Sequence, residues 1–255
     1  MSLRTPVLLS SALLTLAFAA PALAQSECAA NASVDTRLAA ALAKPDRPDK
    51  VKTSDPVRDS ENRFLLQYAK PGDHVLDLGA GGGYSTWLLS AAVCGGDVDS
   101  QNPAKWVSSQ PAQDARNALA AARPNVHLVT SDFDKVPVPA KPYDVVFIGT
   151  IYHDTYNEPG ADGVKMDKNL LATLKSGGLV VVIDHTAPAG SGISDTNTLH
   201  RIDKARVLSD FKAAGFTLVT DSNALANPAD DHSLKVFDPA IRGHTDRMAL
   251  VFKKP

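Results

Sequence analysis

The sequence predicts an α/β fold: one doubly wound, mostly parallel seven-stranded sheet with an antiparallel last strand. Three observations predict it. Short runs rich in β-branched residues alternate with longer segments of helical periodicity along most of the 255 residues. Some runs, such as Leu179–Ile183, are apolar throughout, which is typical of strands covered on both faces. A glycine-rich turn at residues 79–83 separates the first strand from the first helix.

The strands and helices alternate, which implies parallel pairing through right-handed crossovers. The final two strands lack an intervening helix, so we expect them to pair antiparallel at the edge of the sheet. The predicted strands are His74–Leu78, Val98–Gln101, Val126–Thr130, Asp144–Ile148, Leu179–Ile183, Phe216–Thr220 and Arg247–Phe252. The predicted helices are Ser85–Val93, Gln113–Ala122, Met166–Leu174 and Leu199–Ala214, the last ending at a left-handed cap on Gly215.

The chain divides into three predicted parts. Residues 1–24 read as a cleavable signal peptide, because Arg4 is the only charge before an apolar run that ends in Ala22-Leu23-Ala24. The run is too short to span a bilayer, so we expect a periplasmic or secreted product, cut after Ala24, with no stable membrane insertion. Residues 25–62 are predicted to be an N-terminal arm or linker, since 44–62 is rich in Pro and charge without apolar periodicity. Residues 63–255 form the main domain.

Composition excludes several classes of protein. The chain has 26 Lys and Arg against 28 Asp and Glu, a formal net charge of −2. No basic run is present, so nucleic acid is not an expected partner. The only cysteines, Cys28 and Cys94, form no Cys-x-x-Cys pair, which argues against a thiolate zinc site. An oxidising compartment would allow one disulfide between them, but sequence does not place their Cα atoms, so the free and bonded states both stay open.

The glycine turn is the most informative motif. It reads Asp77-Leu78-Gly79-Ala80-Gly81-Gly82-Gly83, and glycine there lets a ligand lie directly against the main chain. Asp77 could orient the loop amides or meet an ammonium group. The third glycine of a dinucleotide fingerprint would fall on Tyr84, so an NAD-dependent oxidoreductase fits poorly, and no lysine follows as a phosphate loop requires. A structural turn without a ligand is the remaining alternative.

The segment Asp77–Gly83 resembles the first motif of class I S-adenosylmethionine-dependent methyltransferases, which have a Rossmann-like fold. The similarity extends over most of the main domain and includes Leu174–Gly178, like the Leu-Lys-Pro-Gly-Gly turn before that family's fifth strand. The chain also resembles an exported, uncharacterised subfamily of predicted methyltransferases in Val182–His185, Asp195–Arg201 and Phe237–Gly243. The resemblance implies S-adenosylmethionine as cofactor and a small-molecule substrate as methyl acceptor.

The resemblance also implies which residues bind the cofactor. Gly79, Gly81, Gly83 and Asp77 would hold its methionine part. Asn102 ends the second strand where the family has an acid for the ribose hydroxyls; an amide can accept one such bond but lacks the charge. Asp132, after the third strand, is the acid that meets the adenine amino group, with Phe133 available to pack on the ring. A turn or cap role for Asp132 is the alternative.

Candidate catalytic residues follow the fourth and fifth strands. Methyl transfer is an in-line displacement, so the protein aligns the reactants, excludes water and provides a base where the acceptor loses a proton. The strand ends bring Tyr152-His153-Asp154 and Asp184-His185 to one edge of the sheet. His153 is the first candidate base and His185 the second.

The remaining polar residues of this edge are candidates for substrate binding. Tyr152, Asp154 and Asp184 are predicted to contact the substrate. His200 and Arg201, at the start of the next helix, are predicted to bind an anionic group. The competing interpretation is that the histidines only bond the backbone.

Three alternatives stay open. Two His and two Asp could converge on magnesium, but the spacing matches no dedicated signature, so no metal is predicted. Residues 223–245 are either a substrate lid or an extended surface hairpin. The rival function is a non-catalytic exported protein that binds a nucleoside or metabolite, motivated by Asn102 and by cofactor supply outside the cytoplasm. The sequence leaves the oligomeric state open.

Overall fold

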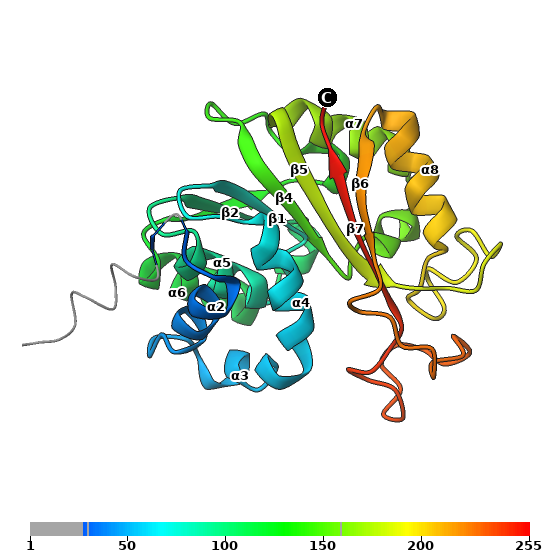
Figure 1. Cartoon of the computed structure of the whole chain (residues 1–255), viewed down its shortest axis with the longest axis horizontal. Helices are drawn as coiled ribbons and strands as arrows, with labels where there is room; N and C mark the ends of the chain where they lie inside the picture. Colours follow the sequence, from blue (N-terminus) through cyan, green and yellow to red (C-terminus); the bar gives the residue numbers. More distant parts are fainter. Residues whose placement is uncertain (1–27, 30, 159) are drawn as a thin grey trace, which may run out of the picture.

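The computed structural model describes residues 28–29, 31–158 and 160–255; the predicted signal peptide lies outside these residues. A single seven-stranded sheet has the order β3-β2-β1-β4-β5-β7-β6 (Figure 1). Strands β1 to β5 pair in parallel, and β7 is antiparallel to both β5 and β6. The predicted fold class is therefore confirmed. The strands are β1 His74–Leu78, β2 Asp97–Asn102, β3 Val126–Thr130, β4 Tyr143–Gly149, β5 Leu174–His185, β6 Thr217–Ser222 and β7 Arg247–Lys253.

The last two strands pair antiparallel as predicted, but only β6 lies at the edge. Strand β7 inserts between β5 and β6. Its residues 248–252 are all buried, whereas β6 is mostly exposed. The more apolar strand thus occupies the interior position, where both of its sides are paired.

Helices cover both faces of the sheet (Figure 1). One face carries α2 (Val34–Leu42), α4 (Asp55–Tyr68), α5 (Tyr84–Ala92) and α6 (Gln110–Ala122), and the other carries α7 (Gly163–Thr173) and α8 (Lys204–Ala214). Each face has its own apolar core. The alternation is visible in β5, where Val181 belongs to the first core and Val182 to the second.

The predicted N-terminal arm is not a linker but part of the first core. It contains α2, the short α3 (Asp49–Lys52) and the start of α4, so the expected boundary at residue 63 falls inside a helix. Helix α4 begins after Ser54 with a proline in its first turn and buries Glu61 and Asn62 beside Phe64. Because part of its buried face is polar, apolar periodicity does not reveal the helix.

A disulfide joins this region to the sheet. Cys28 and Cys94 are bonded, with their Cα atoms 5.3 Å apart. Of the two states left open by the sequence, the structure has the bonded one. Cys94 follows α5 directly, so the bond ties the start of the described chain to the layer that covers β1.

The last helix begins later than predicted. Helix α8 starts at Lys204 because the Asp203 side chain accepts a hydrogen bond from the Ala205 amide and caps it. The predicted His200 and Arg201 therefore lie in the preceding loop. The predicted left-handed cap is confirmed at Gly215, with φ of 103°. No helix within the described residues combines the length and apolar character needed to cross a bilayer.

Candidate active site

The glycine loop leaves the carboxyl end of β1 and is held by the end of β2. Gly79, Gly81 and Gly83 all have positive φ, as the sequence suggested. The Gly79 amide donates to Gln101 Oε1 at 2.9 Å and the Gly81 amide to Asn102 Oδ1 at 2.8 Å. The Asn102 oxygen is therefore engaged, while its buried Nδ2 has no hydrogen-bond partner. Asn102 is fully buried and keeps an unused donor at Nδ2.

Asp77 lies beneath the loop and contacts none of its amides. Its carboxylate accepts a hydrogen bond of 2.6 Å from Thr86 Oγ1, which also lies 3.1 Å from Ser100 Oγ. Burial raises the pKa of Asp77 to about 6, against the opposing effects of Thr86 and Arg58. Gln101 and Asn102, not Asp77, orient the loop.

One cavity borders this loop, and a second lies next to the first. One of about 450 Å³ is lined by Gly81, Gly82, Gly83 and Trp106 among others. The other, of about 570 Å³, is lined by Asp132 and Phe133. Trp106 and Phe133 contact each other edge to face at 5.3 Å, so this aromatic pair forms part of the wall between the cavities.

The loop is covered at one end and open in its middle. A Cβ atom on Gly79 would lie 2.9 Å from Ile151 Cγ1 and 3.2 Å from Phe133 Cε1, so the protein's own side chains pack on this glycine. A Cβ on Gly81 would meet only a backbone oxygen at 3.9 Å. Main chain free of side chains is therefore available to a ligand at Gly81 and Gly82.

Asp132 is exposed and sits at the rim of the larger cavity. It pairs with Lys135 at 2.7 Å, and that hydrogen bond and charge lower the pKa of Asp132. Its φ and ψ of −68° and 159° place it before the short helix η2 (Phe133–Lys135), where its side chain makes no capping bond. The position fits contact with a ligand in the cavity.

The second half of the site is a buried histidine and aspartate pair. His153 begins η3 (His153–Asn157), just after β4, and Asp184 lies near the end of β5. His153 Nδ1 donates to Asp184 Oδ1 and the His153 amide donates to Asp184 Oδ2, both at 2.8 Å. Burial alone would lower the pKa of His153, but the Asp184 carboxylate outweighs it and the net pKa is raised. Despite its own burial, Asp184 has a lowered pKa because of His153.

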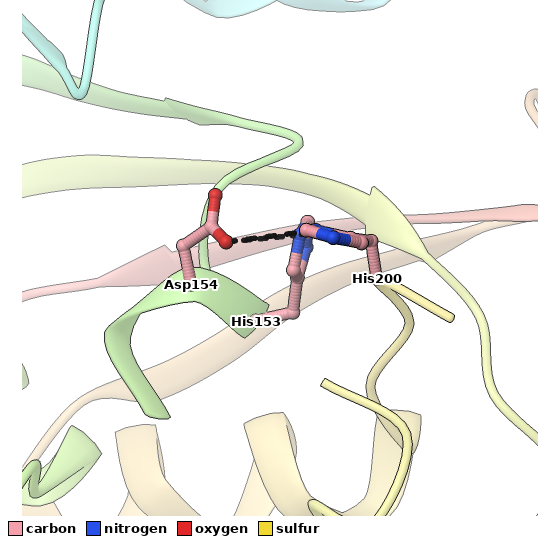
Figure 2. A group of neighbouring side chains, drawn as sticks. All are labelled: His153, Asp154 and His200. Atoms are coloured by element: carbon pink, nitrogen blue, oxygen red, sulfur yellow. Dashed lines mark hydrogen bonds and ion pairs between the residues drawn. The ribbon is translucent and has the colours of Figure 1, made fainter. Parts of the chain in front are cut away.

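The other ring nitrogen of His153 faces two further polar groups (Figure 2). Its Nε2 lies 3.3 Å from His200 Nδ1 and 3.5 Å from Asp154 Oδ1. His200 Nδ1 is 3.7 Å from the same carboxylate oxygen. Three residues that the sequence analysis singled out thus converge on one point.

Four predicted roles fit the structure poorly. His185 is half-buried with its Nδ1 2.8 Å from Thr245 Oγ1, and desolvation lowers its pKa to about 3, which leaves it a weak base. Tyr152 is fully buried and donates to Asp167, so it belongs to the second core instead of contacting substrate. Asp184 is likewise inaccessible and acts as the partner of His153.

Arg201 is the fourth residue whose predicted role fits the structure poorly. Its guanidinium is buried, pairs with Asp230 at 2.9 Å and donates to the carbonyls of Thr186 and Leu234. It is therefore an internal anchor and is not free to bind an anionic substrate. Within the predicted lid, Phe237 packs on His200 with ring centres 4.9 Å apart, so this segment borders the cluster.

Gln101 is the functional residue that the sequence analysis missed. It is fully buried, accepts a hydrogen bond from the Gly79 amide and donates one to the Ser131 carbonyl at 2.6 Å. Gln101 thus links the loop to the end of β3. A signal was present in the sequence, because Ser100-Gln101-Asn102 is a polar run at the end of a predicted strand. Polar residues in such a position need internal partners.

The fold, the glycine loop and the polar edge define a class I S-adenosylmethionine-dependent methyltransferase. The model of the protein-L-isoaspartate(D-aspartate) O-methyltransferase family matches residues 49–213, and the chain belongs to this family. Its cofactor is S-adenosylmethionine, as predicted. No curated protein sequence matches the chain.

Solved structures give the same architecture at low sequence identity. A SAM-dependent methyltransferase from Aquifex aeolicus has a TM-score of 0.55 and 19% identity, over 82% of this chain and 99% of that one. The N-methyltransferase NodS from Bradyrhizobium japonicum WM9 has a TM-score of 0.54 and 14% identity, over 78% and 97%. The [4+2]-cyclase SpnF has a TM-score of 0.58 and 18% identity, over 78% of this chain and 81% of that one. These likenesses show the fold alone; family membership identifies the methyltransferase class.

Proposed function

We propose that this chain transfers a methyl group from S-adenosylmethionine to a small molecule whose hydroxyl or amine loses a proton in the reaction. The observation that carries the proposal is the His153–Asp184 pair beside the cofactor loop. Ile151 packs on Gly79, and His153 follows two residues later with its ring fixed by a buried carboxylate. A carboxylate that orients the ring from Nδ1, with the second ring nitrogen directed toward the polar cluster, is what a general base requires.

The residues present fit the cofactor. Bound S-adenosylmethionine supplies an electrophilic methyl group on a sulfonium. The open main chain at Gly81 and Gly82 would hold its methionine part, and the unpartnered Nδ2 of Asn102 would donate to a ribose hydroxyl. Asp132 and Phe133 line the cavity that suits the adenine end.

The chain's own side chains then prepare the acceptor. His153 takes the acceptor's proton at Nε2, and Asp184 stabilises the resulting imidazolium through Nδ1. Ile151 and Phe133 cover Gly79 and exclude water from this side of the loop. Asp154 and His200, a quarter or less exposed, are the groups that an acceptor would meet from solvent.

A second candidate function is methylation of an isoaspartyl carboxyl group, the activity in the family's name. A carboxylate is already deprotonated at neutral pH and requires no base. It would also approach the Asp154 carboxylate, while Arg201 is occupied by Asp230. The arrangement around His153 therefore favours an acceptor that carries a proton.

We further propose that the chain works in the periplasm or outside the cell. The signal-like residues 1–24 and the Cys28–Cys94 disulfide support this, because such bonds persist in oxidising compartments.

The function is tested by methyl transfer from isotope-labelled S-adenosylmethionine. Phenols, catechols, amines and an isoaspartyl peptide serve as acceptors, with His153→Gln compared with wild type. We expect label on a hydroxyl or amine and a loss of at least about 100-fold in kcat for the variant. Transfer to the isoaspartyl peptide alone, or an undiminished rate in His153→Gln, would reject the proposal.

A further inference from the structure

We infer that His153, Asp154 and His200 bind a divalent transition-metal ion of the zinc class, through His153 Nε2, Asp154 Oδ1 and His200 Nδ1. The three atoms come from two separate segments, η3 and the loop before α8, and are directed toward one another (Figure 2). The inference concerns binding of the ion and does not depend on methyl transfer.

The spacing of the three atoms matches metal ligands. Their separations are 3.3, 3.5 and 3.7 Å. A point equidistant from all three lies about 2.0 Å from each, which is the length of a Zn–N or Zn–O bond. The three atoms are therefore spaced as the ligands of one ion would be.

A second layer of hydrogen bonds fixes the ligands in this orientation. Asp184 accepts from His153 Nδ1, which leaves the lone pair of Nε2 directed at the cluster. A carboxylate behind a histidine ligand is the usual arrangement at protein zinc sites. Asn157 Nδ2 donates to Asp154 Oδ1 at 2.9 Å and holds the third ligand.

His200 is kept in an unfavourable backbone conformation. Its φ is 57°, in the left-handed region that non-glycine residues avoid. The adjacent Arg201 is anchored by Asp230 and two carbonyls, and Phe237 packs on the His200 ring. The surrounding loops thus hold His200 in a strained conformation that brings Nδ1 to the cluster, as is common at functional sites.

The ligand set favours zinc-class ions over magnesium. Two imidazoles with one carboxylate suit Zn²⁺, Co²⁺ or Fe²⁺, whereas magnesium prefers oxygen ligands and retained water. Both carboxylate oxygens of Asp184 accept hydrogen bonds from His153, so Asp184 is not available as a ligand. The magnesium site with two His and two Asp that the sequence left open therefore does not form. Asp154 and His200 have side-chain exposures of 24% and 22%, so solvent reaches two of the three ligands. Three protein ligands with an open position are typical of catalytic sites.

A bound ion would change the role of His153. Its Nε2 lone pair would be used on the metal, and the ion itself would lower the pKa of an acceptor hydroxyl. His153 therefore acts either as a base or as a metal ligand, and the metal content of the protein distinguishes the two roles.

The test is a titration of the full chain, purified in the presence of chelator and dialysed, with Co²⁺ and then Zn²⁺. Co²⁺ gives visible absorption whose intensity reports the coordination number, strong for four ligands and weak for six; Zn²⁺ is followed by calorimetry. We expect one ion per chain and displacement of Co²⁺ by Zn²⁺. Neither cofactor nor acceptor is present, so failure here leaves the proposed methyl transfer untouched.

Two variants and one matched control make the result specific. Asp154→Asn and His200→Asn each should weaken binding at least about 10-fold, and asparagine tolerates the left-handed backbone at residue 200. His127→Ala is the control, since His127 faces Asp97 at 3.5 Å without a second histidine. The inference would be overturned if the wild type bound neither ion at about 100 μM, or if all variants bound with equal affinity. The 3.3 Å contact between His153 Nε2 and His200 Nδ1 would then be an ordinary hydrogen bond.

Discussion

Asp184 holds His153 from two sides, with one carboxylate oxygen on the ring and the other on the backbone amide, each at 2.8 Å. Both residues are buried. Because one carboxylate restrains both the ring and its backbone, the orientation of Nε2 depends on Asp184. Whether Nε2 takes a proton or binds an ion, the same restraint is needed.

Replacement of Asp184 should therefore be costly, while replacement of an equally buried acid should not. Asp167 is also fully buried, but burial raises the pKa of its carboxyl well above the usual range, so a neutral amide replaces it more closely than it replaces Asp184. We expect Asp184→Asn to lower the free energy of unfolding by about 2–3 kcal/mol and Asp167→Asn by less than about 1. Urea unfolding at neutral pH measures both. Equal losses would contradict the assigned charge states.

The raised pKa of Asp77 gives the second prediction, a pH-dependent contribution to stability. Burial raises its pKa to about 6 in the folded chain, from 3.8 in the unfolded one. Between these values the folded chain binds more protons at Asp77, so the contribution of Asp77 to stability falls as pH rises from about 4 to about 6 and is constant outside this window. The shift corresponds to roughly 3 kcal/mol at most.

The variant Asp77→Asn isolates this contribution. Urea unfolding of both proteins between about pH 4 and pH 7 should give a stability difference, wild type minus variant, that declines across the window and then levels off. Other titrating groups cancel in the difference. A difference that rises with pH would mean that Asp77 is ionised and paired in the fold.

The sequence predicted the sheet well because its signals are local. β1 and β3 have their predicted ends, since short apolar runs bounded by turn residues define a strand. Helix α4 was missed because it buries Glu61, whose partner Arg247 comes from a distant segment that no local pattern contains. The insertion of β7 between β5 and β6 likewise depends on tertiary contacts, which local sequence patterns do not contain.

The site was predicted in composition but not in detail. His153, Asp154 and His200 were all named, because residues after neighbouring parallel strands share one edge of the sheet. Their roles depend on partners remote in sequence. Arg201 became an anchor because Asp230 reaches it, and Tyr152 turned into the core toward Asp167. Such pairings decide whether a polar side chain is available, and spacing alone does not contain them.

The disulfide gives a third prediction. Cys28 and Cys94 are 66 residues apart, so the bond restricts a long loop of the unfolded chain. Replacing both cysteines with serine should lower the free energy of unfolding by roughly 4 kcal/mol and the melting temperature by roughly 10 °C. Thermal unfolding with and without reductant measures this. Reductant should destabilise wild type but leave the double variant unaffected, and a wild type insensitive to reductant would rule out the bond.

The last prediction tests the cofactor loop with two glycines that share one backbone constraint. Gly81 and Gly72 have φ of 54° and 86°, and a Cβ on either would make no close contact. Alanine at each position therefore carries a similar conformational penalty of about 1–2 kcal/mol. Gly72 precedes β1 at the opposite end of the strand from the loop. Only the methyl group at residue 81 would stand where the methionine part of the cofactor lies.

We expect Gly81→Ala to weaken S-adenosylmethionine binding by tenfold or more, about 1.4 kcal/mol, while Gly72→Ala binds as wild type. Calorimetric titration gives the affinities, and melting temperatures confirm that both variants are folded and similarly destabilised. The paired design separates backbone strain from direct contact, because strain affects both variants and contact only one. Equal affinities in Gly81→Ala and Gly72→Ala would place the cofactor away from this main chain.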